Sequence, residues 1–314
     1  MGRVYITPCL FSALLACGSA DSPAPPPAPT PVAAPAAPAP APVESAPPTK
    51  RLIALGDLHA DLKTTLAALR LAGLVDEQGA WSGGDSVLVQ TGDQTDRGPD
   101  SLEVLQLLMR LEGEAAAAGG RVVVLLGNHE VMNMMGDWRY VSPEDVSDFG
   151  TEDARRAAFA ADGELGRWLR ERPMVAVIDR TVFVHGGVHP RYAEMGLRRM
   201  NTLADAVIGG SLPREVLGDE SPIWYRGYLQ DDEPTACATL DRALLTLGAR
   251  RMVVGHTTQD SGKIAARCGG KLLGIDVGLS SHYGAHTAAL ELRSGDAWAL
   301  YPDEAIDLPD PGAP

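Results

Sequence analysis

The stretch RLIALGDLHA (Arg51 to Ala60) decides the fold, because a short apolar run ends there at Gly-Asp and delivers polar side chains to a loop. We interpret Arg51 to Leu55 as a strand and Asp61 as the N-cap of a following helix. The same order recurs at SVLVQTGDQTDRG (Ser86 to Gly98) and RVVVLLGNHE (Arg121 to Glu130). Alternating strands and helices predict parallel pairing with right-handed crossovers, and therefore an α/β fold.

Two later apolar runs end at histidine, in HGG (His185 to Gly187) and VVGHT (Val253 to Thr257). Ligands of parallel sheets bind beyond the carboxyl ends of the strands. Because the motifs lie at such ends, we expect these distant segments to meet at one edge of the sheet.

The residues at these ends have the chemistry of a divalent metal site. Carboxylate oxygens and imidazole nitrogens are ligands of hard or borderline divalent ions. Asp57 and His59 can reach one ion from a tight loop, and Asp93 suits a carboxylate that bridges two ions. The other candidate ligands are Asn128, His185 and His256, which could complete a second ion.

The formal charge of −14 over 314 residues limits the classes of partner. An acidic surface repels nucleic-acid backbones and anionic lipid, so we expect no nucleic-acid partner. A phosphorylated substrate would need a local positive site made by metal ions and arginines.

The first 49 residues do not resemble part of the folded domain. Residues 1–17 have the pattern of an export signal, and Leu14 to Cys17 (LLAC) are typical of a bacterial lipobox with Cys17 as the lipidated residue. The alternative is an ordinary cleaved signal. Residues 18–49 are mostly Pro and Ala and predict a disordered linker. We expect a lipid anchor as the sole membrane contact, in the outer membrane of a Gram-negative bacterium, and a catalytic domain at 50–314.

Cys237 and Cys268 lie within this domain and could pair if the protein is exported. The alternative is two buried free thiols, and the absence of a C-x-x-C motif argues against a cysteine zinc site. Residues 137–172 are polar and rich in Arg and Ala, and we expect them to form a cap beside the site.

The strings GDLHA, GDQTDRG, GNHE, HGG and GHT resemble the metallophosphoesterase motifs of the phosphoprotein phosphatase superfamily. GNHEVMNMMGDWRYV (Gly127 to Val141) and SPIWYRGY (Ser221 to Tyr228) are similar to longer blocks of the bacterial-type Shewanella-like protein phosphatases. The resemblance covers most of residues 51–290. It implies a calcineurin-like αβ-sandwich with a dinuclear metal site at the carboxyl ends of the strands.

The resemblance also implies roles for single residues. The first ion would be held by Asp57, His59 and Asp93, and the second by Asp93, Asn128, His185 and His256. His129 would be the general acid, oriented by Asp96. Arg97 and Arg226 would bind the phosphate, with Arg139 as a rival to Arg226. Manganese is the expected metal, with iron or zinc as alternatives. Ala60 stands where the superfamily usually has Gly, and we expect its methyl group to be tolerated.

These residues predict a metal-dependent phosphomonoesterase, similar to protein phosphatases, in which a water bridging two ions attacks phosphorus directly. The substrate would be a phosphorylated protein or a small phosphoester, and the resemblance adds a preference for phosphotyrosine. The alternative is a phosphodiesterase or dinucleoside polyphosphate hydrolase with the same site. A third hypothesis is a surface lipoprotein that binds a partner without turnover.

Overall fold

The computed structural model describes residues 50–312. The predicted export signal, Cys17 and the linker up to residue 49 lie outside the described residues. Within residues 50–312, none of the helices has the length and apolar character needed to span a bilayer.

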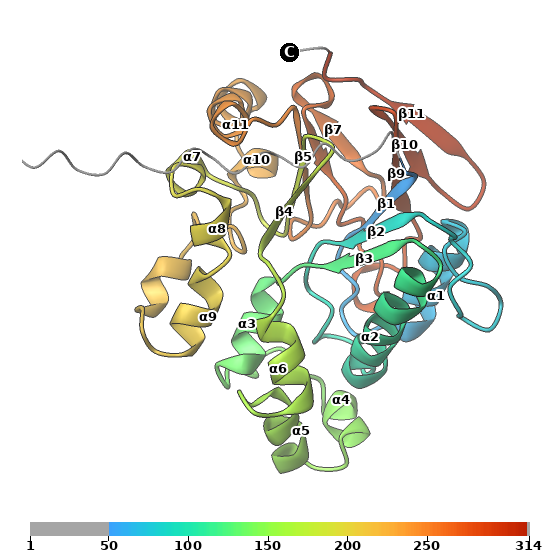
Figure 1. Ribbon diagram of the computed structural model, residues 1–314, viewed down its shortest axis with the longest axis vertical. Helices are drawn as coiled ribbons and strands as arrows, with labels where there is room; N and C mark the ends of the chain where they lie inside the picture. The colour runs from blue at the N-terminus through green and yellow to red at the C-terminus, as the bar shows by residue number, and fades with distance from the viewer. Residues whose placement is uncertain (1–49, 313–314) are drawn as a thin grey trace, which may run out of the picture. The chain divides into compact units, whose positions relative to one another are not determined.

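Two sheets form the centre of the fold (Figure 1). The first has the order β11-β10-β9-β1-β2-β3, in which β1, β2 and β3 pair in parallel as predicted and the other three strands pair antiparallel. Its strands are β1 (Leu52–Leu55), β2 (Val87–Gln90), β3 (Arg121–Val124), β9 (Ala289–Arg293), β10 (Asp296–Leu300) and β11 (Ala305–Leu308).

The second sheet has the order β4-β5-β6-β8-β7, with β5, β6 and β8 in parallel. Its strands are β4 (Val175–Ile178), β5 (Thr181–Val184), β6 (Arg251–Val254), β7 (Ala265–Arg267) and β8 (Leu272–Gly274). The parallel strands of both sheets therefore present a set of carboxyl ends to the loops that follow them.

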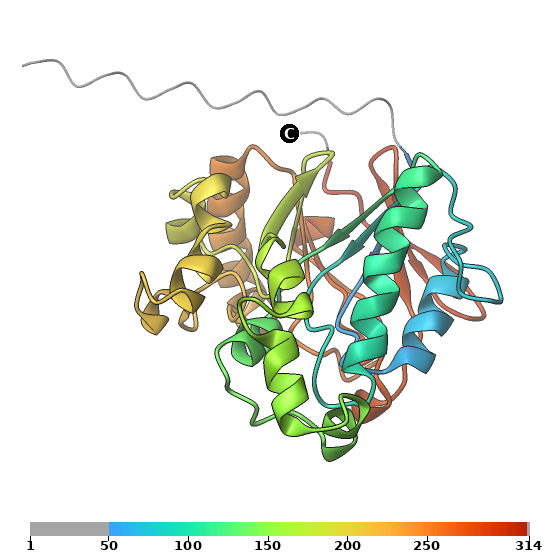
Figure 2. The ribbon, with the colours of Figure 1, turned by 60° about the horizontal axis from the view of Figure 1, so that its bottom comes forward.

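Side chains alternate between the two faces of each strand, and this alternation builds the layers. In β1, Ile53 and Leu55 pack under the helices α1 (Leu62–Leu71) and α2 (Ser101–Ala117), whereas Leu52 and Ala54 face the other sheet. In β5, Phe183 faces the first sheet, and its neighbours along the strand pack against helices. Figure 2 shows the two sheets between a helical layer on each side.

The helical layer over the second sheet follows in chain order. It consists of α7 (Pro190–Ala193), α8 (Leu197–Met200), α9 (Leu203–Ile208), the 3₁₀ helix η1 (Arg214–Leu217), α10 (Gly227–Gln230) and α11 (Glu233–Leu247). Two further 3₁₀ turns are η2 (Cys268–Gly270) and η3 (Ser281–Tyr283). A disulfide joins Cys237 of α11 to Cys268 of η2, so it ties this layer to the edge of the second sheet.

The segment 137–172 forms three short helices that lie beside α3 (Asn128–Met134) (Figure 1). They are α4 (Pro143–Asp148), α5 (Glu152–Phe159) and α6 (Glu164–Arg170). Ser142 and Thr151 cap α4 and α5 by accepting backbone N–H groups. We call the segment 137–172 the cap segment.

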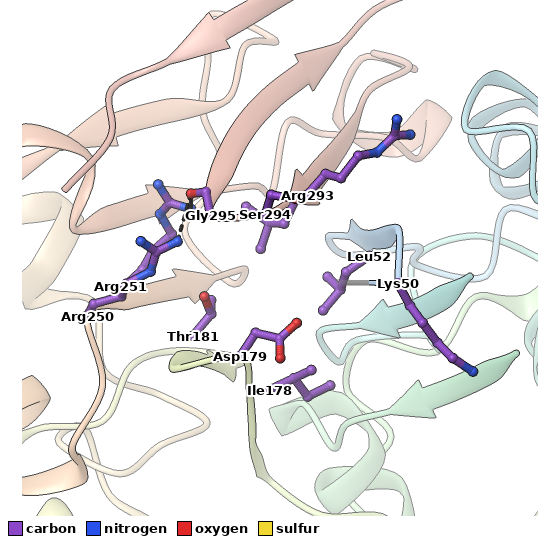
Figure 3. A pocket seen from close by; sticks show the side chains of 11 residues that line it. Lys50, Leu52, Ile178, Asp179, Thr181, Arg250, Arg251, Arg293, Ser294 and Gly295 are labelled. Atoms are coloured by element: carbon purple, nitrogen blue, oxygen red, sulfur yellow. Dashed lines mark hydrogen bonds between the residues drawn. The ribbon is translucent and has the colours of Figure 1, made fainter. Parts of the chain in front are cut away.

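The amino ends of the parallel strands form the opposite edge of the sandwich (Figure 3). Arg250, Arg251, Asp179 and Gly295 lie there around a small pocket. We call this set of residues the basic edge.

Candidate dinuclear metal centre

The structure brings all six predicted metal ligands together at the carboxyl ends of five strands. Each exposes at most 5% of its surface. The residues are Asp57 after β1, His59 in the same loop, Asp93 after β2, Asn128 after β3, His185 after β5 and His256 after β6. Segments up to 199 residues apart thus form one buried polar cluster.

Asp93 lies at the centre of this cluster. Its carboxylate and the imidazoles of His185 and His256 have ligand atoms within 4.8 Å of one another, and the same holds for Asp93 with His59 and His129. Asp57 Oδ2 is 3.8 Å from His59 Nε2, and its Oδ1 is 3.8 Å from His185 Nδ1. Asp93 is common to both groups, which fits a carboxylate placed between two neighbouring ions, although His129 of the first group is the predicted general acid and not a predicted ligand.

The imidazoles direct one ring nitrogen to the centre, where His185 Nε2 lies 3.0 Å from Asn128 Oδ1 and 3.2 Å from Asp93 Oδ2. His185 Nδ1 donates to the carbonyl of Thr91 at 3.0 Å, and His59 Nδ1 donates to the carbonyl of Thr95 at 3.3 Å. Because a carbonyl can only accept, Nδ1 of each ring carries a hydrogen, and the neutral form of the ring has its lone pair on Nε2. His256 Nε2 is buried without a hydrogen-bond partner. A divalent ion would satisfy these nitrogens, so the donor set fits the group that it is predicted to hold.

Among the described residues, the carboxylates of the cluster also lack positive partners that would fully balance their charge. Burial, together with the carboxylates of Asp276 and Asp93, raises the pKa of Asp57 well above its ordinary value. Burial lowers the pKa of His59 to about 3 and that of His256 well below 6.5, so both rings are neutral. Crowded carboxylates beside neutral imidazoles favour binding of a cation.

Two glycines let the loops approach this closely. A Cβ atom at Gly127 would collide with the carboxylate of Asp93, and one at Gly255 would collide with the carboxylate of Asp57. The strings GNHE and GHT therefore need glycine for space.

The backbone of the site is strained. Non-glycine residues adopt left-handed conformations here, which are uncommon and cluster at functional sites. They are His59, Ala60, Asp93, Asp96, Arg97 and His256. Ala60 has φ 51°, so the restriction at this position is the backbone conformation and not the volume of the methyl group.

Two carboxylates of the site were not assigned a role from the sequence. Glu130 accepts the backbone N–H groups of Gly127, Asp93 and Gln94 at 2.8–2.9 Å, and so fixes the loop of Asp93 against the start of α3. It belongs to the GNHE string, which could have revealed it. Asp276 is 2% exposed and accepts from Thr258 Oγ1 at 2.7 Å. Its signal was the apolar run before it.

His129 and Asp96 form a pair beside the cluster. His129 Nδ1 donates to Asp96 Oδ2 at 2.8 Å, and Nε2 lies 3.7 Å from Asp93 Oδ2. Burial would lower the pKa of His129, but Asp93 and Asp96 outweigh it and raise the pKa. The imidazole can therefore carry a proton on the nitrogen that faces the cluster.

The three candidate arginines have different surroundings in the structure. Arg97 lies over the ring of Tyr140 at 4.0 Å, and its buried Nε has no hydrogen-bond partner. Arg226 Nη1 donates to the carbonyl of His256 at 2.6 Å. Arg139 is 63% exposed and its guanidinium pairs with Asp137 at 2.6 Å. Arg226 is thus next to a predicted ligand, whereas Arg139 is an exposed residue that lines the cavity beside Asn128.

A cavity of about 240 Å³ opens beside the cluster. Asn128 forms part of its wall, with Met132, Leu217 and Trp224 among the apolar neighbours, and the charged lining residues are Asp137, Arg139 and Arg214.

An αβ-sandwich with such a cluster at the strand ends defines a metallophosphoesterase. Residues 50–260 match the calcineurin-like phosphoesterase family, and the chain belongs to that family. It is a hydrolase of phosphoric esters, and both the predicted fold class and the predicted resemblance are confirmed.

Individual relatives add detail to the assignment of the chain to this family. The chain is 35% identical to Shewanella-like protein phosphatase 2 of Arabidopsis thaliana, over 74% of this chain and 72% of that protein. The solved structure of a cold-active protein-tyrosine phosphatase from a psychrophilic Shewanella species is similar, with a TM-score of 0.73, 29% identity and coverage of 82% and 80%. A symmetrical bis(5′-nucleosyl)-tetraphosphatase of Methylococcus capsulatus is 29% identical over 55% of this chain and 57% of that protein.

Proposed function

We propose that this phosphoesterase hydrolyses phosphomonoesters of proteins, with phosphotyrosine as the preferred side chain. The observation that carries the proposal is the shared carboxylate of Asp93 beside the His129–Asp96 pair. An ester that leaves as an alcohol or phenol needs both an activated water and a proton donor.

The six clustered residues would hold two divalent ions, manganese first and iron or zinc as alternatives. One ion would take Asp57, His59 and Asp93, and the other would take Asp93, Asn128, His185 and His256. When bound, the ions supply Lewis-acid chemistry that stabilises phosphoryl charge and makes water nucleophilic at neutral pH.

The arginines and the histidine would act on the phosphoryl group itself. Arg97 and Arg226 bind its peripheral oxygens, because a forked guanidinium matches the charge that spreads over them. As the P–O bond breaks, its electron pair stays on the leaving oxygen, which takes the proton from His129 Nε2. Asp96 keeps the imidazole in position through Nδ1.

The preference for phosphotyrosine rests on the cavity of about 240 Å³ beside Asn128. Its walls of Met132, Leu217 and Trp224 suit an aromatic ring, since apolar and thioether groups pack well against aromatic faces. The similarity to a protein-tyrosine phosphatase of Shewanella points the same way.

The second candidate is hydrolysis of a dinucleoside polyphosphate. The similarity to the tetraphosphatase of Methylococcus capsulatus favours it, although that similarity covers a smaller part of the chain.

A panel of substrates tests the proposal with the manganese-loaded protein. The panel contains a phosphotyrosine peptide, the same peptide with phosphoserine, bis(nitrophenyl) phosphate and diadenosine tetraphosphate. We expect kcat/KM for the phosphotyrosine peptide to exceed that for each other substrate by about tenfold, which is about 1.4 kcal/mol of transition-state preference. A chelator should abolish turnover, and added manganese should restore it. Faster cleavage of diadenosine tetraphosphate would support the second candidate instead.

We also propose that the protein is exported and anchored through Cys17. The LLAC string supports this, and so does the disulfide between Cys237 and Cys268, because disulfides persist in oxidising compartments. Growth of a bacterium that expresses the full chain with a labelled fatty acid should label the protein, and Cys17→Ser should remove the label. Label that persists in Cys17→Ser would contradict the anchor.

A further inference from the structure

Arg155 of the cap segment is a buried charge that the proposed reaction has not used. It lies on α5 and exposes none of its surface. Its Nε donates to Asp145 Oδ2 at 2.8 Å, its Nη1 to Asn133 Oδ1 at 2.7 Å, and its Nη2 to Asp96 Oδ1 at 3.4 Å. One guanidinium thus joins α4, α3 and the loop after β2.

These contacts engage both oxygens of the Asp96 carboxylate. Oδ2 accepts from His129 Nδ1 at 2.8 Å, while Oδ1 accepts from Asn133 Nδ2 at 2.9 Å and from Arg155. A chain of buried side chains therefore runs from the cap segment to the imidazole of His129.

Aromatic faces fix the guanidinium from the other sides. Its Cζ lies 4.7 Å from the ring centre of Phe159 and 5.2 Å from that of Trp138. Three donors in a rigid fork serve three acceptors here, which the single ammonium of a lysine cannot do with the same geometry. The arrangement matches the contacts of an arginine in particular.

We propose that Arg155 is a positioning residue for the general acid. By holding Asp96, it keeps His129 with Nδ1–H directed to the carboxylate and Nε2 directed to the phosphoryl group. The inference rests on the proposed function, in which His129 protonates the leaving oxygen. Through Arg155, the cap segment would help to position the general acid, in addition to lying beside the cluster.

The dependence of the rate on the leaving group tests this role. Hydrolysis of phenyl phosphate releases phenolate, a basic leaving group that needs a proton. Hydrolysis of dinitrophenyl phosphate releases a stabilised phenolate that needs none. For Arg155→Met we expect kcat with phenyl phosphate to fall by about 100-fold, the lower range of a general-acid contribution. We expect the loss with dinitrophenyl phosphate to stay below about threefold on the same grounds.

Arg156 provides the matched control. It follows Arg155 on α5, pairs with Glu152 at the surface and stacks on Trp138 at 4.4 Å. Arg156→Met removes the same group from the same helix and should leave both rates unchanged. Equal losses on both substrates in Arg155→Met would overturn the inference, because they would indicate a general structural effect.

Two further variants keep the test decisive. If circular dichroism shows that Arg155→Met is unfolded, Arg155→Lys keeps a charge without the fork and should lose rate selectively with phenyl phosphate. In a His129→Asn background, Arg155→Lys should cause no further loss with phenyl phosphate, and an added loss would overturn the inference. Failure of the proposed function is distinct, because the wild-type protein would then turn over neither ester.

Discussion

The basic edge and the metal centre lie at opposite ends of the same strands and treat buried charge differently. At the basic edge, Arg251 is 1% exposed and donates to the carbonyl of Gly295 at 3.2 Å (Figure 3). It also donates to the carbonyl of Gly270 at 3.1 Å. At the metal centre, His256 Nε2 and Arg97 Nε are buried without partners. Burial of polar groups is common to both edges, and buried nitrogens without a hydrogen-bond partner distinguish the metal centre from the basic edge.

Strained backbone conformations occur at both edges and therefore do not distinguish them. Asp179 and Arg180 are left-handed at the basic edge, with φ of 48° and 60°. They form the two-residue connection between β4 and β5, and tight hairpins of this kind require positive φ at both central residues. The strain there accompanies a chain reversal, whereas at Asp93 and His256 it occurs at predicted ligands within the buried cluster.

The largest expected effect comes from replacing one carboxylate at each edge. Asp93→Asn should lower kcat by about a thousandfold, because Asp93 is the proposed ligand of both ions and its loss would remove several kcal/mol of phosphoryl stabilisation. Metal content by mass spectrometry should fall as well. Asp179→Asn, the same change at the basic edge, should leave rate and metal content unchanged. An Asp93→Asn variant with full activity would contradict the proposed centre.

The sequence was sufficient to predict the parallel strands and the six clustered residues, because each such residue follows an apolar run. It could not predict the role of Arg155, since that role depends on how α5 packs against α3 and the loop of Asp96. The choice between Arg226 and Arg139 depends on tertiary contacts, because Arg226 contacts the backbone of His256 and Arg139 lines the cavity beside Asn128. The pairing of Cys237 with Cys268 was left open because spacing alone does not bring two thiols together.

A medium effect on stability, without an effect on the reaction, is expected at the basic edge. Arg251→Met removes donors from the carbonyls of Gly270 and Gly295 and should lower the free energy of unfolding by about 1–3 kcal/mol. Urea denaturation measures the loss, and kcat per folded molecule should not change. Arg250→Met is the control, because Arg251 would still donate to Gly295, and its loss should be smaller. A fall in kcat for Arg251→Met would show that the two edges are coupled.

The smallest effect is expected at Ala60. This residue of the metal centre has a strained backbone conformation and no ligand side chain. At φ 51°, an L-residue other than glycine pays about 1–2 kcal/mol for the left-handed conformation. Glycine removes this strain but loses about 0.4–1 kcal/mol through the greater freedom of its unfolded chain. Ala60→Gly should therefore raise the free energy of unfolding by roughly 0.8 kcal/mol, the difference between the midpoints of these two ranges.

Ala68, in the middle of α1, gives the opposite sign for the same substitution, because helix interiors disfavour glycine by about 1 kcal/mol. Urea denaturation of both variants measures the two signs side by side. A loss of stability in Ala60→Gly would mean that contacts of the methyl group outweigh the strain. The left-handed loop of the metal centre would then be held by packing, as the loop at the basic edge is held by its hairpin.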